Sequence, residues 1–439
     1  MADATDQTLV SSTDGPEGEP TEQLVLVCLG SPERNFVHAG AVHPLHGLHC
    51  VRFGRSADDQ HHAHAEQGAL ELQIPLPWVS SRHAELHLEG PGLRVVDHGS
   101  RNGTHIEGQA VQTRAMLGLG KVLEVGRSFW LLRLVRRSAL APLPDQPLPR
   151  MANPEVHHLR HVLARLAPSN VPILVTGETG TGKERLARSI HAMSGRSGPF
   201  VPVSLAAGSL DRLLRDSPHL HAARGGTLYL DDVGELSPEE QNTLTSTLMS
   251  HAPSDWQLEH PRQGELRLVA SSTRDLRAMV ASGAFRPDLM ARLAGFEARL
   301  PPLRARREDL GPLVLETLAA GPSEEPPRLT TEVFRAMLAH SWPFNLRELH
   351  HSLITAANLV DPERTRIDPE IWGQACWTVE GGDATPNRIE AVRRELVQQM
   401  AHHRGELSAV AAALRCEIED IRRWADRFSL QPERYRDVG

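Results

Sequence analysis

A glycine-rich run at residues 177–184 constrains the fold of this chain more than any other feature. An apolar segment at 172–176 precedes the run, and a pattern typical of a helix follows it at 183–193. Between a strand and a helix, glycines let backbone N–H groups turn toward a phosphate, and the helix N-terminus adds its dipole. We therefore predict a nucleotide-binding loop in an α/β domain rather than an incidental turn. The predicted nucleotide contacts are Gly177, Glu178, Thr179, Gly180, Thr181, Gly182, Lys183 and Glu184.

The lysine content supports this prediction. Of the 47 basic residues, only Lys121 and Lys183 are lysines, and all the others are arginines. Codon bias explains an arginine-rich chain, but a compact ammonium fits among phosphate oxygens where a guanidinium does not. Lys183 therefore stands where lysine is chemically required, whereas the sequence offers no reason for Lys121.

Changes in the apolar pattern divide the 439 residues into a multidomain protein, as the length allows at roughly 100–200 residues per domain. Short strands between Gly, Pro, Asn and Asp turns predict an all-β sandwich first, and alternating strands and helices predict an α/β domain with a parallel sheet next. The predicted segments are a disordered tail at 1–20, the sandwich at 21–138, a linker at 139–150, the α/β domain at 151–315, an all-helical part at 316–376, a linker at 377–386 and a helical segment at 387–434.

Charge and cysteine content exclude several classes of protein. A net charge of −8 argues against a protein that coats nucleic acid or anionic membrane along its whole length. The longest apolar runs, at 24–29 and 129–132, are far shorter than the roughly 18 residues of a membrane span, so no membrane partner is expected. Four widely spaced cysteines without a C-x-x-C pair disfavour zinc and disulfides. We expect a cytoplasmic protein.

Three polar patterns fall between the predicted strands of the sandwich, at 54–55, 80–83 and 97–104. Arginine presents a planar donor fork to a phosphate, and Ser and Asn add neutral hydrogen bonds. In this order the patterns resemble the forkhead-associated (FHA) domain, which binds phosphothreonine peptides. The resemblance implies a phosphothreonine-containing protein as partner, with Gly54 and His83 shaping the loops. The implied phosphopeptide contacts are Arg55, Ser80, Arg82 and Asn102.

The sandwich departs from the FHA pattern at two places. Ser81 stands where the family often has Arg, and the stretch from Arg55 to Ser80 is long. That stretch contains His61, His62 and His64, which could bind a metal, although a solvated polar insertion is the favoured interpretation.

The phosphate loop ends in Glu184, where the generic loop has Ser or Thr. With the runs at 225–236, 283–289, 300–309 and 342–349, residues 151–360 resemble the AAA+ ATPase domain of the sigma-54-dependent transcription activators. The resemblance implies ATP and Mg²⁺ as cofactors, with Asp231 on the metal and a helical lid at 316–376. It also implies that Arg286 and Arg292 reach a neighbouring subunit's nucleotide in a homo-oligomer, and that Arg347 senses nucleotide. Taken alone, each of these arginines would be interpreted as a surface ion pair.

The positions around the attacking water differ from this family. Asp232 replaces the water-activating Glu, and Ser204 and Thr273 each replace an Asn. Because a displacement of about 1 Å can lower a rate on the order of 100-fold, we hypothesise an ATPase that binds ATP and hydrolyses it slowly. The family's sigma-54 contact loop is also missing between Ser204 and Gly225, which places a sigma-54 contact in doubt.

The segment 387–434 resembles the Fis-type helix-turn-helix, whose last helix enters the DNA major groove. Arg415 stands where the family has a turn glycine, and Glu417, Glu419 and Asp420 face phosphates unfavourably. A dimerising helical bundle is therefore the alternative to DNA binding. The implied DNA contacts are Arg422, Arg423 and Arg427.

Two hypotheses for function follow. The first is an ATP- and DNA-binding transcription regulator of the sigma-54-dependent type, controlled by phosphothreonine recognition through the FHA domain. The second is a phosphopeptide-reading adaptor, whose AAA+ domain binds nucleotide without remodelling sigma-54 polymerase.

Overall fold

The structure is a computed structural model, and several of the sequence predictions fall on residues that it does not describe. These are the tail at 1–20, the linkers at 139–150 and 377–386 and most of the shortened segment after Ser204. In the predicted helix-turn-helix they are Arg415, Glu417, Glu419, Asp420, Arg423 and Arg427. The described residues are 22–36, 38–58, 60–89, 92–137, 152–205, 222–251, 266–320, 325–361, 365–376, 396–397, 399–400, 402–413, 418, 421–422, 425 and 430.

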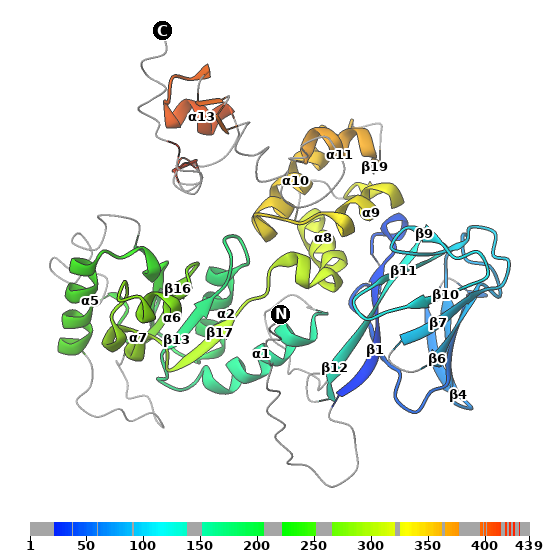
Figure 1. The fold of residues 1–439 in the computed structure, drawn as a ribbon, viewed down its shortest axis with the longest axis horizontal. Helices are drawn as coiled ribbons and strands as arrows, with labels where there is room; N and C mark the ends of the chain where they lie inside the picture. The colour runs from blue at the N-terminus through cyan, green and yellow to red at the C-terminus, as the bar shows by residue number, and fades with distance from the viewer. Residues whose placement is uncertain are drawn as a thin grey trace, which may run out of the picture.

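The predicted β-sandwich is confirmed, with sheet orders β2-β1-β12-β11-β8-β9 and β10-β7-β6-β3-β5-β4 (Figure 1). The apolar residues of these strands fill the space between the two sheets and form one buried cluster. The strands are β1 (Glu22–Gly30), β2 (Val42–Pro44), β3 (Cys50–Arg55), β4 (His62–Glu66), β5 (Ala69–Ile74), β6 (Ala84–Glu89), β7 (Gly92–Asp97), β8 (Thr104–Ile106), β9 (Gln109–Ala110), β10 (Arg114–Leu117), β11 (Val122–Val125) and β12 (Ser128–Arg136), with a short 3₁₀ helix η1 (Pro32–Arg34) after β1.

The α/β domain is built on a five-stranded sheet of order β14-β15-β16-β13-β17, in which every pairing is parallel, as predicted. Buried clusters lie on both faces of the sheet, which explains the nearly uninterrupted apolar runs of its strands. The elements are α1 (Pro154–Leu166), β13 (Ile173–Thr176), α2 (Lys183–Met193), β14 (Phe200–Ser204), β15 (Thr227–Asp231), η3 (Val233–Glu235), α5 (Pro238–His251), β16 (Arg267–Ser272), α6 (Leu276–Ala281), α7 (Pro287–Leu293) and β17 (Phe296–Arg299).

A helical lid follows the α/β domain. The prediction that 316–376 is all-helical is wrong at two places, where the short strands β18 and β19 pair in parallel. Leu329 and Ile367 of these strands are buried in the lid core, so burial outweighs the helical pattern around them. The lid elements are η4 (Leu303–Ala305), η5 (Arg307–Asp309), α8 (Leu310–Ala319), β18 (Arg328–Leu329), α9 (Thr331–Ala339), α10 (Asn345–Leu359), β19 (Arg366–Ile367) and α11 (Pro369–Ala375).

The sandwich and the lid share one hydrophobic core, and they lie against each other in Figure 1. Strand β12 contributes to both cores, because successive side chains of a strand point to opposite faces of the sheet. Trp130 and Leu132 point into the sandwich core, whereas Phe129 and Leu131 belong to the core of the lid. The ring of Phe129 packs edge-on against Phe334 of α9, with 5.1 Å between ring centroids. The first half of β12, residues 128–132, is therefore buried on both faces.

Gly311 in α8 offers a test of this docking. A Cβ at Gly311 would lie 2.1 Å from the carbonyl oxygen of Leu29 in β1. We expect Gly311→Ala to lower the free energy of unfolding by about 1–3 kcal/mol, because the backbone of the sandwich would have to move. The matched control is Gly373→Ala in α11, where an added Cβ would meet no atom within 4 Å. That variant should gain about 0.5–1 kcal/mol from helix propensity. Calorimetric unfolding measures both, and equal midpoints for the two variants would contradict the docking.

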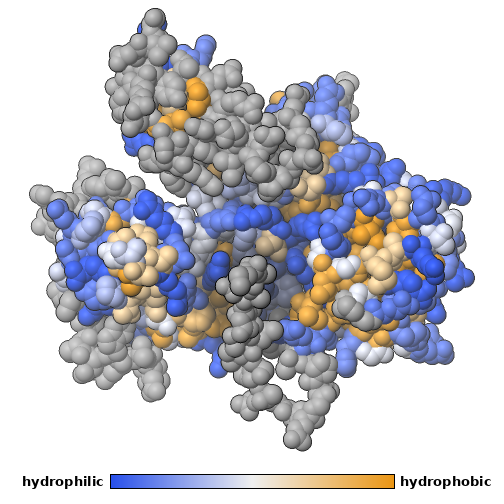
Figure 2. Space-filling view, viewed as in Figure 1, coloured by the Kyte–Doolittle hydropathy of each residue, from blue (hydrophilic) through white to orange (hydrophobic). Residues whose placement is uncertain are grey.

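The C-terminal residues that the structure describes form a separate small cluster, which includes α13 (Leu407–Ala413) and the buried side chains of Met400 and Ile421. Phe344 of the lid packs against this cluster. Within the described part of the chain, no helix is long and apolar enough to cross a membrane. On the face drawn in Figure 2, hydrophobic surface gathers over the sandwich. Met116 of β10 and Leu134 of β12 are exposed residues of this domain.

Candidate functional site

The glycine-rich loop lies between β13 and α2, where the sequence predicted it. Gly177, Gly180 and Gly182 have φ values of 154°, 75° and 98°, a region that disfavours other residues. A Cβ at Gly180 would lie 2.1 Å from the carbonyl oxygen of Phe344, so the lid approaches the loop backbone directly. The Nζ of Lys183 donates to the carbonyl oxygens of Gly177 and Glu178 at 3.0 and 3.2 Å. The ammonium is therefore held inside the loop.

Three side chains that the sequence analysis left without a role join the lid to this loop. Arg304 forms a bidentate ion pair with Glu178, at 2.7 and 2.5 Å. Buried Arg306 donates to the carbonyl oxygen of Thr181 at 2.8 Å. Asn345 donates to the carbonyl oxygen of Thr179 at 2.9 Å. The acidic residue inside the predicted loop was the available signal, because a carboxylate such as Glu178 can form a bidentate pair with an arginine.

The three substituted positions around the attacking water follow neighbouring strands of the sheet. Ser204 ends β14 and is in register with Asp231, which ends β15. Asp232 comes next, and Thr273 follows β16. Both the N–H and the hydroxyl of Thr273 donate to Oδ1 of Asp232, at 2.8 and 2.9 Å. The structure therefore brings Asp232 and Thr273 into direct contact and holds the carboxylate in place.

Asp231 is the predicted Mg²⁺ ligand, and one of its two carboxylate oxygens already accepts hydrogen bonds from the protein. Its Oδ1 accepts hydrogen bonds from the hydroxyls of Tyr229 and Ser271, at 2.7 and 2.5 Å. Among the described residues Oδ2 makes no such bond, so it can serve as an oxygen ligand of the kind Mg²⁺ prefers. The loop also fits a nucleotide phosphate, because the first turn of α2 has no side-chain cap to occupy its N–H groups.

The predicted finger arginines lie on the surface of the α/β domain. Arg286 precedes α7 and pairs with Asp288 through two hydrogen bonds of 2.9 and 2.6 Å. Arg292 lies in α7 and is partly exposed. In the lid, exposed Arg347 lies beside the phosphate loop, since a Cβ added at Gly180 would lie 3.3 Å from the Cβ of Arg347. The structure thus brings Arg347 to the nucleotide loop and leaves Arg286 in an ion pair within its own subunit.

The predicted phosphopeptide residues lie at one end of the sandwich. The N–H of Arg55 donates to the carbonyl oxygen of Ser80 at 3.0 Å, and the hydroxyl of Ser80 accepts from the N–H of Arg101 at 3.2 Å. Asn102 donates to the carbonyl oxygen of Trp78 at 2.8 Å. A groove of about 350 Å³ is lined by Arg55, Arg82 and eight other residues, but Ser80 and Asn102 are not among them.

Gly54 and His83 shape these loops as the resemblance implied. A Cβ at Gly54 would lie 2.5 Å from the carbonyl oxygen of Ser81. His83 is fully buried and accepts from the N–H of Ser80 at Nδ1, so Nε2 carries the proton and donates to the carbonyl oxygen of Gly103. Burial lowers the pKa of His83, which keeps this neutral tautomer at physiological pH.

The histidine-rich stretch is mostly exposed, as expected for the solvated insertion that we favoured, but His61 departs from that prediction. Residues 62–66 form strand β4, which pairs with β5, and the ring of His61 stacks on Trp130. The apolar indole explains the difference, since it withdraws His61 from water. Among the described residues, no group of three or more His, Cys, Asp or Glu side chains is arranged to hold a metal.

The connecting segment, residues 303–309, contacts the phosphate loop and the sandwich at once. Arg304 and Arg306 contact the phosphate loop. Arg307 donates to the carbonyl oxygen of Gly120 in the sandwich, at 2.5 Å. The carboxylate of Glu308 forms a bidentate pair with Arg133 of β12, at 3.0 and 2.8 Å. Arg304 and Arg306 on one side and Arg307 and Glu308 on the other therefore link the nucleotide loop to the sandwich.

Asp309, at the end of this segment, gives the protein a pH dependence. It is fully buried, and burial followed by the charge of Glu308 raises its pKa to about 7. Between its ordinary value near 3.8 and about 7, the folded chain holds a proton that the unfolded chain has released, so stability falls as pH rises through this window.

Asp309→Asn removes this titration and keeps the oxygen that accepts from the N–H groups of Ala152 and Asn153. Relative to the variant, the wild type should lose on the order of 4 kcal/mol of unfolding free energy as pH rises from about 4 to about 7. Urea unfolding at several pH values measures the difference. Parallel stability profiles for the two proteins would show that Asp309 does not titrate in this window.

Comparison with known proteins agrees with this architecture. The family described as Sigma-54 interaction domain matches residues 152–303, and the family described as FHA domain matches residues 51–126. The DNA-binding transcriptional regulator NtrC of Bradyrhizobium sp. (strain RP501 Parasponia) is 34% identical over 218 residues, which are 45% of this chain and 45% of that protein. The Response regulator protein PilR of Pseudomonas aeruginosa is 30% identical over 343 residues, which are 71% of this chain and 76% of PilR.

A crystal structure of NtrX from Brucella abortus in complex with ATP is 28% identical, with a TM-score of 0.46, and the match covers 65% of this chain and 70% of that chain. The chain spans about half the length of the NtrC proteins of Bradyrhizobium and Rhizobium meliloti. Both family matches, together with the identity and coverage of PilR, lead to one conclusion. The chain belongs to the sigma-54-dependent transcriptional regulators of the NtrC type, and it carries an FHA domain ahead of its sigma-54 interaction domain.

Proposed function

We propose that this chain is a transcription regulator that binds ATP at the phosphate loop and DNA through its C-terminal helices, and that a phosphothreonine partner controls it through the FHA domain. ATP would be held by Lys183 and the loop N–H groups, with Mg²⁺ at Asp231. Arg55, Ser80, Arg82 and Asn102 would bind the phosphopeptide. The order of the domains and membership in the family support this proposal.

The connecting segment is the observation that carries the control part of the proposal. Arg306 holds the phosphate loop at Thr181, and two residues later Glu308 holds Arg133 of the sandwich. The side chains of Arg306 and Glu308 are buried, so neither contact is diluted by solvent. A shift of the sandwich on peptide binding would therefore move the residues that hold the nucleotide loop.

A second candidate function is favoured by one specific observation. The carboxylate of Asp232 accepts two hydrogen bonds from Thr273, which leaves it poorly available to activate water. Together with the missing sigma-54 contact loop after Ser204, this supports a phosphopeptide-reading adaptor in which bound nucleotide acts as a switch. ATP turnover well below about 1 s⁻¹ and no specific DNA band in a gel shift at moderate salt would favour the adaptor.

The test is the affinity of the full chain for a fluorescent ATP analogue, with and without a phosphothreonine peptide selected from a library. We expect the peptide to change the nucleotide affinity about 5-fold or more, the size of ordinary allosteric coupling. Arg55→Ala should abolish peptide binding, and Arg114→Ala, an exposed arginine on β10, is the matched control.

Glu308→Gln should leave both affinities measurable and reduce their coupling, because its neutral amide weakens the pair with Arg133. If the library yields no phosphothreonine peptide that binds the chain, the FHA part of the proposal is refuted. Unchanged nucleotide affinity with the peptide bound would refute the control part.

A further inference from the structure

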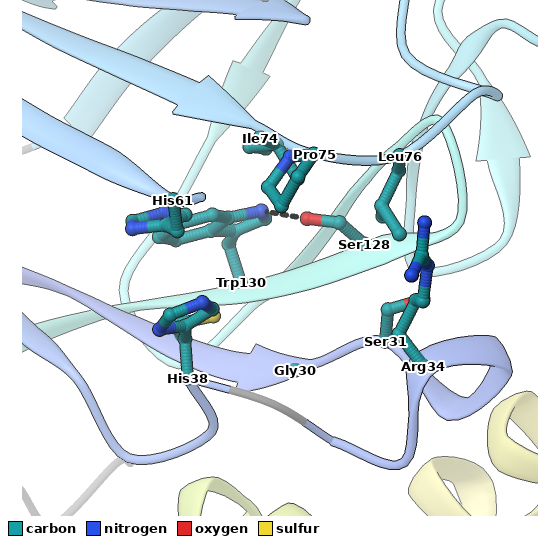
Figure 3. A pocket seen from close by; sticks show the side chains of 11 residues that line it. Gly30, Ser31, Arg34, His38, His61, Ile74, Pro75, Leu76, Ser128 and Trp130 are labelled. Carbon is teal, nitrogen blue, oxygen red and sulfur yellow. Dashed lines mark hydrogen bonds between the residues drawn. The ribbon is translucent and has the colours of Figure 1, made fainter. Parts of the chain in front are cut away.

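A cavity of about 140 Å³ lies at the edge of the sandwich and shares no lining residue with the groove that Arg55 lines (Figure 3). It is bounded by β1 and β12 of one sheet, by the end of β5 in the other sheet, and by η1. None of its eleven lining residues is acidic. A cavity of roughly 150 Å³ lined by apolar groups is large enough for one benzene ring, so this one admits a single ring.

One side of the cavity is aromatic and uncharged. The imidazole of His61 lies over the indole of Trp130 at an interplanar angle of 26°, as Figure 3 shows. The indole N–H donates to the hydroxyl of Ser128, so the ring presents only its π surface. Burial lowers the pKa of His61 to about 4, and the imidazole is neutral at physiological pH. This side therefore suits an aromatic ring.

The other side is polar and carries a positive charge. The hydroxyl oxygen of Ser31 is buried, with 5% of the residue exposed, and it has no hydrogen-bond partner among the described residues. The guanidinium of Arg34 lies beside it at the mouth of the cavity (Figure 3). A buried hydroxyl without a partner is costly, and an anionic oxygen would satisfy it together with the arginine.

The aromatic side also has a polar atom to satisfy. Nε2 of His61 is buried and lacks a hydrogen-bond partner within the described part of the chain. A hydroxyl on the far side of the ring from the carboxylate would supply one. We propose that this cavity is a binding site for a small aromatic carboxylate, with the ring against Trp130 and His61 and the carboxylate on Ser31 and Arg34.

The position of the site gives it access to the lid. Helix η1 supplies Arg34 to the cavity, and its neighbour Glu33 points the other way, where it pairs with Arg127 and accepts from Thr331 of α9. Phe36, two residues after η1, packs against Phe334 of α9 with 4.8 Å between ring centroids. The segment that would hold the carboxylate is thus the segment that docks the sandwich on the lid.

The test is isothermal titration of the full chain with 4-hydroxybenzoate. A ligand of this size is expected to bind with a dissociation constant of about 0.1–1 mM. The uncharged analogue 4-hydroxybenzyl alcohol should bind at least about 10-fold more weakly, because it lacks the charge-assisted hydrogen bonds. Arg34→Gln should weaken the binding of 4-hydroxybenzoate by a similar factor. The control is Arg94→Gln: Arg94 lies in β7 and forms an exposed ion pair with Glu89 of β6, so this variant should bind 4-hydroxybenzoate like the wild type.

Leu76→Phe provides a second variant, since the larger side chain fills part of the cavity and should abolish binding without removing a charge. The proposal is overturned if 4-hydroxybenzoate gives no saturable heat up to about 10 mM. It is also overturned if the alcohol binds as tightly as the acid, or if folded Arg34→Gln binds like the wild type.

Discussion

Replacing Lys183 with alanine is expected to weaken ATP binding at least about 100-fold, because the ammonium makes charge-assisted hydrogen bonds that each contribute about 1.5–3 kcal/mol. The structure supplies the reason for so large an effect. The Lys183 side chain is buried against the loop, and its Nζ already lies within 3.2 Å of two loop carbonyl oxygens. Titration with a fluorescent ATP analogue measures the loss.

The chain provides its own matched control for this substitution. Lys121, the other lysine, is exposed in the turn before β11. Lys121→Ala removes the same charge and the same side chain far along the sequence from the loop, so its ATP affinity should equal that of the wild type. If the two variants bind ATP equally well, the loop at 177–184 is not the nucleotide site.

The double variant Asp232→Glu with Thr273→Asn is expected to hydrolyse ATP about 10–100-fold faster than the wild type. Thr273 holds the short carboxylate of Asp232 through two hydrogen bonds to the same oxygen, so the group cannot reach outward. Glutamate adds a methylene, and asparagine removes the hydroxyl that donates one of these bonds. Phosphate release at saturating ATP measures the gain.

Thr273→Ser is the control for this experiment, because serine keeps both the hydroxyl and the N–H that hold Asp232. We expect its turnover to equal that of the wild type. A double variant no faster than the wild type would mean that the position of this carboxylate does not limit hydrolysis. The adaptor hypothesis would then have to rest on the missing loop alone.

Much of the fold could be predicted because its signals are local. The strand before the phosphate loop and the helix after it were predicted at 172–176 and 183–193, and the structure has them at Ile173–Thr176 and Lys183–Met193. The sandwich followed from short apolar runs between turn residues. The short strands β18 and β19 were missed, since two residues carry no period and their pairing partners are distant in sequence.

The candidate site could be predicted only in part. A motif identifies candidate ligand-binding residues, so the glycines and Lys183 were predicted from spacing, and Asp231 from the family resemblance. Arg306 and Asn345 contact the loop backbone from more than a hundred residues away, and neither carries a local pattern that announces this. His61 was misjudged for the same reason, because its partner Trp130 lies in another sheet of the sandwich.

The sequence by itself determined the order of the domains and the position of the glycine-rich loop with Lys183 in it. These depend on residues close together in the chain, where sterics and hydrogen bonding of the backbone decide the structure. Only the tertiary structure decided that the sandwich and the lid share a core and that residues 303–309 join both to the nucleotide loop. The alternation along β12 shows the physical reason. A run of apolar residues reveals that both faces of a strand are buried, but what covers each face depends on residues from distant parts of the chain.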